Sequence, residues 1–595
     1  MQAASAATSA PAVPYRRREA ALAAVVLVAI AVTGCTGSAP QPRAASVPSG
    51  AEADGGVDAV RSPSDEPGGT LRVVAGTPDS LDPAASYFPW VWNIMRLYTR
   101  TLVTYAAAPG EAGAQLVPDL ATDTGVTTDG GRTWTYTLKP DQRFEDGQVI
   151  TAQDVKYGIE RSFASDVIVG GPTYVVDLLD DPANVYGGPY TDPDPNNLGL
   201  AGIETPDAHT LVFRLNRPYA DFDHVMALPS SSPVPQAADT GADYGADPVS
   251  SGPYTIATVD PVLGIALERN PSWDRSSDSV RTALPDRIEI RTGLSGPDRD
   301  QRVVGGSADL DLMPAGVQED LLPRIEADVG LRARVDRAPS GSVRMLALPQ
   351  GVAPMDDEHC RRAVAYAVDR AGLVEQVGAE AASAASMLWP RGLPGSSPEG
   401  AAPVPVDGLA AARTELAACG RPDGFSTRIA APNEQRPLQL AREVAADLAR
   451  VGIDAQVTAL DPATYYGAEI GRPPNVAAAG YGILLTAWTG DLPTPATYFP
   501  PLVSAVQPAG NANYAEIVHP ALTDLVSTAL SAPDPAAAAS AWRDLDAALV
   551  EAAAYVPLLE DRVIVLAGER LRNAALHPAY GGYDLAVVGV RDAPG

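Results

Sequence analysis

Residues 129–155 read DGGRTWTYTLKPDQRFEDGQVITAQDV, a stretch that contains a strand signal, a turn signal and a helix start. The strand signal is an alternation of large apolar residues with threonines, at Trp134, Tyr136 and Leu138. Such an alternation predicts a strand with one buried face. The FEDG sequence at 144–147 then predicts a turn.

The helix start lies directly after this turn. Thr151 followed three residues later by Asp154 forms a capping box. Apolar residues then recur at helical spacing, at Val155, Ile159 and Phe163. The sequence therefore predicts a capped helix behind a half-buried strand.

The same two patterns recur along the chain. A further strand is predicted at Leu71, Val73 and Val74, and a helix at Leu440, Val444 and Leu448. The helix is followed by Gly452 and by a strand pattern at Ile453, Ala455, Val457 and Ala459. Asp356 is the predicted cap of another helix. Interleaved helices and strands indicate a mixed α/β fold.

Length and charge limit the function classes. The chain has 595 residues, 46% of them hydrophobic, so two or three domains are expected. Its formal net charge of -30 disfavours a nucleic-acid partner, because the phosphate backbone is also negative.

The N-terminal region has the layout of an export signal. Arginines at 16–18 precede an apolar run at 20–32, which is too short for a comfortable membrane span. The sequence VTGC ends at Cys35 and resembles a bacterial lipobox. It implies a lipoprotein signal peptide over residues 1–34 and lipid-modified Cys35, which would anchor the exported protein to the outer face of the cell membrane. An ordinary cleaved signal with an incidental cysteine is the alternative.

The composition of residues 35–69 predicts a disordered tether, because Ala, Pro, Ser, Gly and Asp dominate there and large apolar residues are almost absent. Cys360 and Cys419 then remain, and either a disulfide or two buried thiols would fit them. The histidines are scattered, and neither a metal-binding nor a nucleophile motif is present in the sequence. No metal, cofactor or catalytic residue is expected.

A set of short motifs resembles family 5 solute-binding proteins, the extracytoplasmic receptors of ABC importers for oligopeptides, dipeptides and nickel. The set covers the chain from Gly68 to about Leu566. The matching segments, in order, are PDLA at 118–121, DGGRTWTY at 129–136, FEDG at 144–147, TAQDV at 151–155, SGPY at 251–254, LERNP at 267–271, GSADL at 306–310, DD at 356–357, RRAVAYAVDR at 361–370, PDGF at 422–425 and VGI at 451–453.

The resemblance implies a two-lobed, periplasmic-binding-protein-like α/β fold with a ligand cleft between lobes joined by a hinge. An extra domain is inserted near the N-terminal part. The expected boundaries are lobe I at 70–100, 200–318 and 561–595, inserted domain II at 101–199, and lobe III at 319–560.

The resemblance also implies a ligand site around residues 487–491, AWTGD. In the peptide receptors a GWxxD loop at this point supplies an aspartate that pairs with the ligand's α-ammonium. Here Asp491 would be that acceptor, next to Trp488, Thr489 and Gly490, and Trp488 would form a wall. An exposed loop aspartate without this role is the alternative.

Other candidate ligand contacts lie elsewhere in the chain. Gln435-Arg436-Pro437 resembles the QRP of dipeptide receptors, whose arginine clamps the ligand's C-terminal carboxylate, although Arg436 could equally cap or flank the helix that begins there. Ser86, Tyr87 and Trp90 follow Leu81-Asp82-Pro83, where family members place ligand-contacting residues.

The expected function is therefore capture of short peptides and their delivery to an ABC permease with its ATPase subunits, by a monomer without catalysis. The nearer alternative is the same fold with a non-peptide ligand such as a metal chelate, oligosaccharide or opine. The farther alternative is a lipid-anchored hydrolase or sensor.

Overall fold

The computed structural model describes residues 54–591, apart from residues 182, 184, 195, 397–407 and 533. The predicted signal peptide, Cys35 and the predicted tether up to residue 53 lie outside the described residues. Within the described ranges, no helix is both long enough and apolar enough to cross a bilayer.

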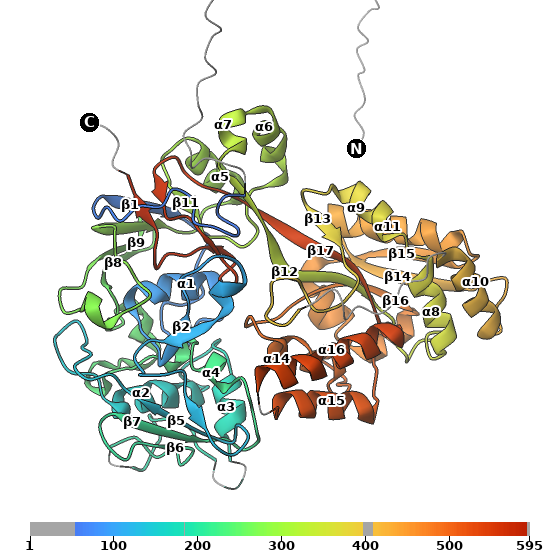
Figure 1. The fold of residues 1–595 in the computed structure, drawn as a ribbon. Helices are drawn as coiled ribbons and strands as arrows, with labels where there is room; N and C mark the ends of the chain where they lie inside the picture. Colours follow the sequence, from blue (N-terminus) through green and yellow to red (C-terminus); the bar gives the residue numbers. More distant parts are fainter. Residues whose placement is uncertain are drawn as a thin grey trace, which may run out of the picture. The chain divides into compact units, whose positions relative to one another are not determined.

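Three larger sheets organise the described chain (Figure 1). Sheet A has five strands in the order β11 (Leu310–Asp311), β1 (Thr70–Val74), β10 (Arg287–Arg291), β9 (Gly264–Arg269) and β8 (Tyr254–Asp260). The predicted strand at 71–74 is β1, which pairs in parallel with β10 and β11. Its Leu71 and Val73 are buried while Arg72 between them is exposed, as the side-chain alternation of a strand requires.

Sheet C contains the strand predicted at 134–138. Its four strands are β4 (Val126–Thr127), β5 (Thr133–Thr137), β7 (Thr210–Arg214) and β6 (Ile203–Glu204). Trp134 and Tyr136 of β5 are buried, which confirms the predicted face. A domain boundary at residue 200 would divide this sheet, because β6 and β7 follow that residue and β4 and β5 precede it.

Helix α2 (Ala152–Glu160) begins as predicted. The side-chain hydroxyl of Thr151 accepts from the backbone N–H of Asp154, and the Asp154 carboxylate accepts from the backbone N–H of Thr151 at 2.8 Å. The predicted apolar residues on and just beyond this helix are all buried. The capping box therefore sets the start of α2.

Sheet B has six strands, in the order β13 (Ala382–Ala384), β17 (Tyr555–Leu566), β12 (Val335–Ala347), β16 (Ile483–Thr489), β14 (Ser426–Pro432) and β15 (Asp454–Leu460). Strands β12 and β17 are the longest and pair antiparallel, with an irregular register between Pro339 and Val343. The last half of β17 lies against a segment next to sheet A, since the Val317 N–H donates to the Ile564 carbonyl at 2.7 Å. The first half of β12 pairs with this half of β17.

The remaining strands form three short pairs, which are β2 (Val103–Tyr105) with β3 (Leu116–Pro118), β18 (Leu571–Arg572) with β21 (Gly589–Val590), and β19 (Leu576–His577) with β20 (Gly582–Tyr583). The helices beside sheets A and C are α1 (Pro89–Tyr98), α3 (Tyr174–Leu179), α4 (Phe222–Val225), α5 (Gly296–Val304), α6 (Leu322–Ala327) and α7 (Val329–Arg332).

The helices that follow β12 in the chain are α8 (Glu358–Ala367), α9 (Arg370–Val377), α10 (Gly408–Ala418), α11 (Gln435–Ala449), α12 (Pro462–Thr464), α13 (Pro473–Ala479), α14 (Pro495–Tyr498), α15 (Pro520–Leu530) and α16 (Pro535–Glu551). Helix α11 and strand β15 confirm the helix and strand predicted at 440–459. The cap predicted at Asp356 is wrong by one residue, because Asp357 accepts from the N–H groups of His359 and Cys360.

The predicted tether is too long at its C-terminal end, because residues 54–69 pack against the fold. Arg61 is 4% exposed and pairs with Asp336 of β12, and the Arg61 N–H donates to the Ala574 carbonyl at 2.9 Å. The amino-acid composition of residues 54–69 does not predict these bonds, because they are made by one buried arginine and by backbone groups.

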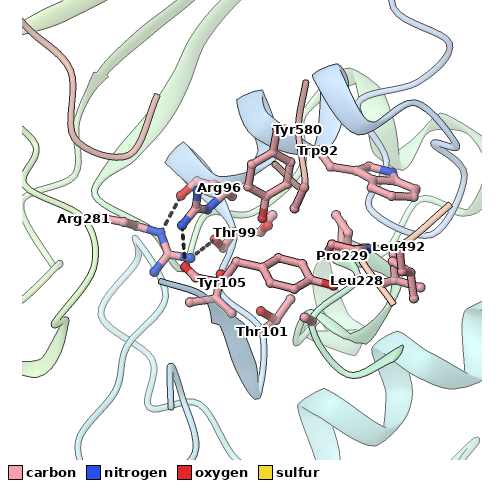
Figure 2. Close-up of a pocket in the computed structure, with 14 residues that line it drawn as sticks. Trp92, Arg96, Thr99, Thr101, Tyr105, Leu228, Pro229, Arg281, Leu492 and Tyr580 are labelled. Carbon is pink, nitrogen blue, oxygen red and sulfur yellow. Dashed lines mark hydrogen bonds between the residues drawn. The ribbon is translucent and has the colours of Figure 1, made fainter. Parts of the chain in front are cut away.

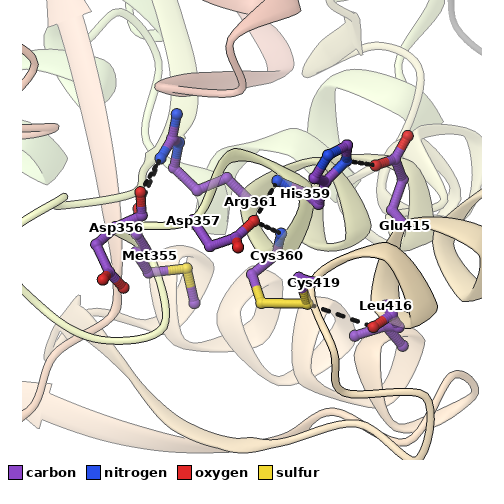
Figure 3. Close-up of a disulfide and its surroundings, with 9 residues drawn as sticks. All are labelled: Met355, Asp356, Asp357, His359, Cys360, Arg361, Glu415, Leu416 and Cys419. Carbon is purple, nitrogen blue, oxygen red and sulfur yellow. Dashed lines mark hydrogen bonds and ion pairs between the residues drawn. A yellow bond between two sulfur atoms is a disulfide. The ribbon is translucent and has the colours of Figure 1, made fainter.

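Cys360 and Cys419 are joined by a disulfide with a Cα–Cα distance of 5.5 Å. Figure 3 shows that it links the start of α8 to the end of α10. His359 and Glu415 make a second link between the same helices, 2.7 Å from Nδ1 to Oε2. Of the two alternatives for these cysteines, the structure contains the disulfide.

Candidate ligand-binding site

The segment that follows β16 contains Asp491. Trp488, near the end of β16, is fixed in place because its indole N–H donates to the Tyr498 carbonyl at 2.9 Å. Its ring meets the ring of Tyr514 edge-on, with 6.4 Å between centroids. Trp488 and Gly490 are half-buried, whereas Thr489 is exposed. A rigid strand end therefore positions the residues up to Asp491.

The carboxylate of Asp491 accepts hydrogen bonds from two tyrosine hydroxyls. Tyr87 comes from the loop before α1 and Tyr174 is the first residue of α3, and both bond to Oδ2. Burial, together with the hydrogen bond and negative charge of Asp491, raises the pKa of each tyrosine above its usual range. Both hydroxyls therefore keep their protons and act as donors.

No arginine, lysine or histidine of the described chain forms an ion pair with Asp491. The carboxylate is half-buried and receives two neutral donors. A cationic group would make a stronger, charge-assisted bond to it than a hydroxyl does. The arrangement is thus chemically suited to an ammonium group.

Tyr174 was not among the residues that the sequence predicted. It lies in a segment that carries no recognisable motif, and 317 residues separate it from Asp491. The only signal in the sequence is an aromatic residue with a polar end, which is too common to select this one position.

Ser86 and Trp90 are buried residues that flank the Tyr87 loop. Ser86 is 0% exposed and donates its hydroxyl to Asp79 Oδ1 at 2.9 Å, while the Tyr87 N–H donates to Oδ2 of the same carboxylate at 2.6 Å. Trp90 is 4% exposed and stacks on Phe88. In this conformation these contacts position Tyr87.

One edge of β16 is open near Asp491. In the described part of the chain, β14 pairs with β16 at Ile483 and Leu484 alone. Further on, the Ala487 N–H donates to the Tyr466 hydroxyl at 3.1 Å instead of to a strand. Because backbone groups alternate in direction along a strand, the N–H of Thr489 points to the same side as that of Ala487.

Arg436 lies elsewhere, in the first turn of α11. It forms an ion pair with Glu319 at 3.0 Å and lines a cavity of about 520 Å³ together with Arg344 and Arg562. In the described structure Arg436 and Asp491 do not contact each other. Of the predicted site residues, the structure thus brings Tyr87 to Asp491 but not Arg436.

A small enclosed space lies between α1 and the residue after Asp491 (Figure 2). It has about 20 Å³ and is lined by Leu492, Tyr105, Tyr580 and Arg96, among others. The Arg96 guanidinium lies 4.7 Å from the centre of the Tyr580 ring and donates to the Tyr105 carbonyl at 2.9 Å. The space would hold one water at most, so it is a packing feature beneath the Asp491 loop.

The described residues contain no group of three or more His, Cys, Asp or Glu side chains that could hold a metal ion. His577 is fully enclosed, and burial lowers its pKa to about 4, so it stays neutral at ordinary pH.

Comparison with known proteins gives consistent matches. Residues 115–509 match the family described as bacterial extracellular solute-binding proteins, family 5 Middle. The glutathione-binding protein of Shigella dysenteriae serotype 1 is 25% identical over 463 residues, covering 76% of this chain and 82% of that protein.

A probable D,D-dipeptide-binding periplasmic protein of Escherichia coli strain K12 is 24% identical over 310 residues, covering 51% of this chain and only about half (53%) of that protein's length. Among solved structures, clavulanic acid biosynthesis oligopeptide binding protein 2 is 42% identical with a TM-score of 0.85. That match covers 91% of this chain and 99% of the other.

These matches confirm the predicted fold class, a two-lobed α/β fold of the periplasmic-binding-protein kind. The relatives are binding proteins rather than enzymes by their descriptions. Because the family match spans well over half of the sequence, the chain belongs to the bacterial extracellular solute-binding proteins of family 5.

Proposed function

We propose that this protein binds short peptides between its lobes and delivers them to a membrane permease, without catalysing a reaction. The observation that carries the proposal is the Asp491 carboxylate, which meets two neutral hydroxyls and no cation in the described structure. A peptide's α-ammonium would supply the missing positive charge. The relatives named for dipeptides, glutathione and oligopeptides support the same ligand class.

The open edge of β16 supports a peptide rather than a simple amine. An extended peptide can add to an exposed strand edge through main-chain hydrogen bonds, which do not depend on side-chain identity. Ala487 and Thr489 lie four and two residues before the end of the AWTGD segment, close enough for a peptide that starts at Asp491. Trp488 would form a wall of the site.

Arg436 would bind the other end of the ligand. Its present partner Glu319 is 59% exposed, so the pair is accessible to solvent. A peptide carboxylate could replace Glu319, since the planar guanidinium binds both carboxylate oxygens at once.

Capture would proceed by closure of the lobes around the ligand. Strands β12 and β17 connect the two sides, and their irregular register between Pro339 and Val343 is the proposed hinge. The closed form would then dock on an ABC permease powered by separate ATPase subunits. Lipid modification of Cys35, attachment to the outer face of the cell membrane, a monomeric state and the lobe boundaries given above, except the one at residue 200, belong to this proposal.

Calorimetric titration tests the proposal directly. A soluble form that starts at residue 36 keeps every described residue, and it would be titrated with a pool of free di- to pentapeptides and with the same pool N-acetylated. Saturable binding of the free pool alone, lost in Asp491→Asn and kept in the exposed control Asp524→Asn, is the expected result. Equal binding of both pools, or of neither, would contradict the role of Asp491.

A further inference from the structure

A second cavity lies beside the Asp491 loop. It has about 370 Å³ and is formed where residues 493–495 meet the segment 220–224 and the helix α16. Pro493 lines it and is two residues from Asp491, so the two positions are at most about 7 Å apart along the chain. A long peptide side chain can span a distance of this size.

Two carboxylates line the cavity without a strong cation. Asp221 accepts a hydrogen bond from the Thr494 hydroxyl, and Asp223 accepts from the backbone N–H of His224 at 2.9 Å. Neither forms an ion pair with a lysine or arginine of the described chain. Burial raises the pKa of Asp223 to about 6; the neighbouring His224 opposes this rise and the charge of Asp221 adds to it.

His224 is the one basic side chain among the described residues that line the cavity. Its Nδ1 lies 3.1 Å from the Tyr105 hydroxyl. A single imidazole does not balance two carboxylates. The cavity therefore keeps a net negative charge.

Two tryptophans form the opposite wall. Trp389 is 0% exposed, and its indole N–H has no hydrogen-bond partner in the described part of the chain. Trp542 is 2% exposed and stacks on Phe499 at 5.7 Å between centroids. Tryptophan faces attract cations, so a wall with two indole rings suits a positively charged group.

We propose that this cavity binds the cationic side chain of a peptide, a guanidinium or ammonium group held by Asp221 and Asp223 against the tryptophan wall. The inference rests on the proposed function, and it assigns that function to peptides that carry a basic residue. The cavity walls come from segments far apart in the chain, 220–224 on one side and 389–395 with 493–542 on the other. A cation bound here would hold these segments together and favour the closed form.

The test compares arginine with citrulline, which has the same shape but no charge. Alanine tripeptides with arginine at the first, second or third position would be titrated into the form that starts at residue 36, next to their citrulline counterparts. We expect the arginine peptide to bind at least about tenfold more tightly in at least one position. In Asp221→Asn/Asp223→Asn this preference should fall to within about twofold while citrulline peptides still bind.

The matched control is Asp524→Asn/Asp544→Asn, which removes two exposed carboxylates and should keep the preference. Thermal unfolding of each variant checks that it is folded. If arginine and citrulline peptides bind equally well at every position in the unmodified protein, the inference is overturned and the proposed function stands. If no tripeptide binds, both are overturned.

Discussion

Arg61 and Asp336 form an ion pair between residues 275 positions apart, and their side chains are 4% and 0% exposed. The same carboxylate accepts from the Tyr583 hydroxyl at 2.6 Å and from the Gly56 N–H at 2.9 Å. Asp336 belongs to β12, the strand that leads into sheet B. The segment before the first strand thus holds one of the two connecting strands in place.

Arg61→Ala should therefore destabilise the protein. It leaves the Asp336 carboxylate buried without its counter-charge, a change that typically costs about 3 to 5 kcal/mol of unfolding free energy. Urea unfolding followed by circular dichroism measures the loss. Arg214→Ala, which breaks an exposed pair with Glu204, is the matched control and should have little effect. Equal losses of unfolding free energy in the two variants would show that the buried Arg61–Asp336 pair contributes no more to stability than the exposed pair.

The disulfide should stabilise the region of α8 and α10. Cys360 and Cys419 are 59 residues apart, and a closed loop of this length is expected to contribute about 4 kcal/mol by restricting the unfolded chain. Reduction, or Cys360→Ser/Cys419→Ser, should lower the urea midpoint accordingly. Dithiothreitol should have no further effect on the double variant. An unchanged midpoint after verified reduction would contradict the prediction.

Local patterns were sufficient for elements whose signals lie within a few residues. The alternation at Trp134 and Tyr136 gave the buried face of β5, and Thr151 gave the start of α2, because strand and cap geometry depend on near neighbours. The capping error at Asp356 has the same origin, since two adjacent aspartates can both cap and only the backbone decides between them.

Long-range contacts were not predictable in the same way. Residues 54–69 have the composition of a tether, yet Arg61 bonds to β12 far along the chain. Tyr174 likewise meets Asp491 only because the fold joins α3 to the end of β16. The family resemblance indicated Asp491 and Tyr87, but no sequence motif indicated Tyr174, the other hydrogen-bond donor to Asp491.

The pH dependence of stability should carry a contribution from Asp546 in α16. Burial raises the pKa of Asp546 to about 7, whereas an aspartate in an unfolded chain titrates near about 4. Between these values the folded protein keeps a proton that the unfolded chain releases, so the free energy of unfolding falls as the pH rises. The loss over this window is about 4 kcal/mol.

Asp546→Asn should remove that slope, because the amide oxygen can still accept from the Leu388 N–H, which lies 2.8 Å from the carboxylate. Urea unfolding at intervals from pH 4 to pH 7 would show a flatter profile than that of the unmodified protein. Asp544→Asn, an exposed position on the same helix, should keep the original slope. A parallel profile for Asp546→Asn would mean that this carboxyl is not protonated in the folded state.

The affinity for peptides should depend on Arg436, if the ligand is the proposed short peptide. If Arg436 clamps the C-terminal carboxylate, Arg436→Ala should weaken binding of free peptides by about ten- to a hundredfold, as for the loss of a charged hydrogen bond. C-amidated peptides lack that carboxylate, so their affinity should be the same in the variant and in the unmodified protein. Calorimetry with matched free and amidated peptides separates the two effects.

Arg442→Ala is the control, because Arg442 is an exposed arginine on the same helix, without an ion pair in the described structure. Arg442→Ala should leave the affinities for free and for amidated peptides unchanged. It therefore controls for the loss of one positive charge on this helix. An equal weakening of free and amidated peptides in Arg436→Ala would instead point to the pair with Glu319. That pair would then hold the start of α11 in place, and the carboxylate would be bound by another group.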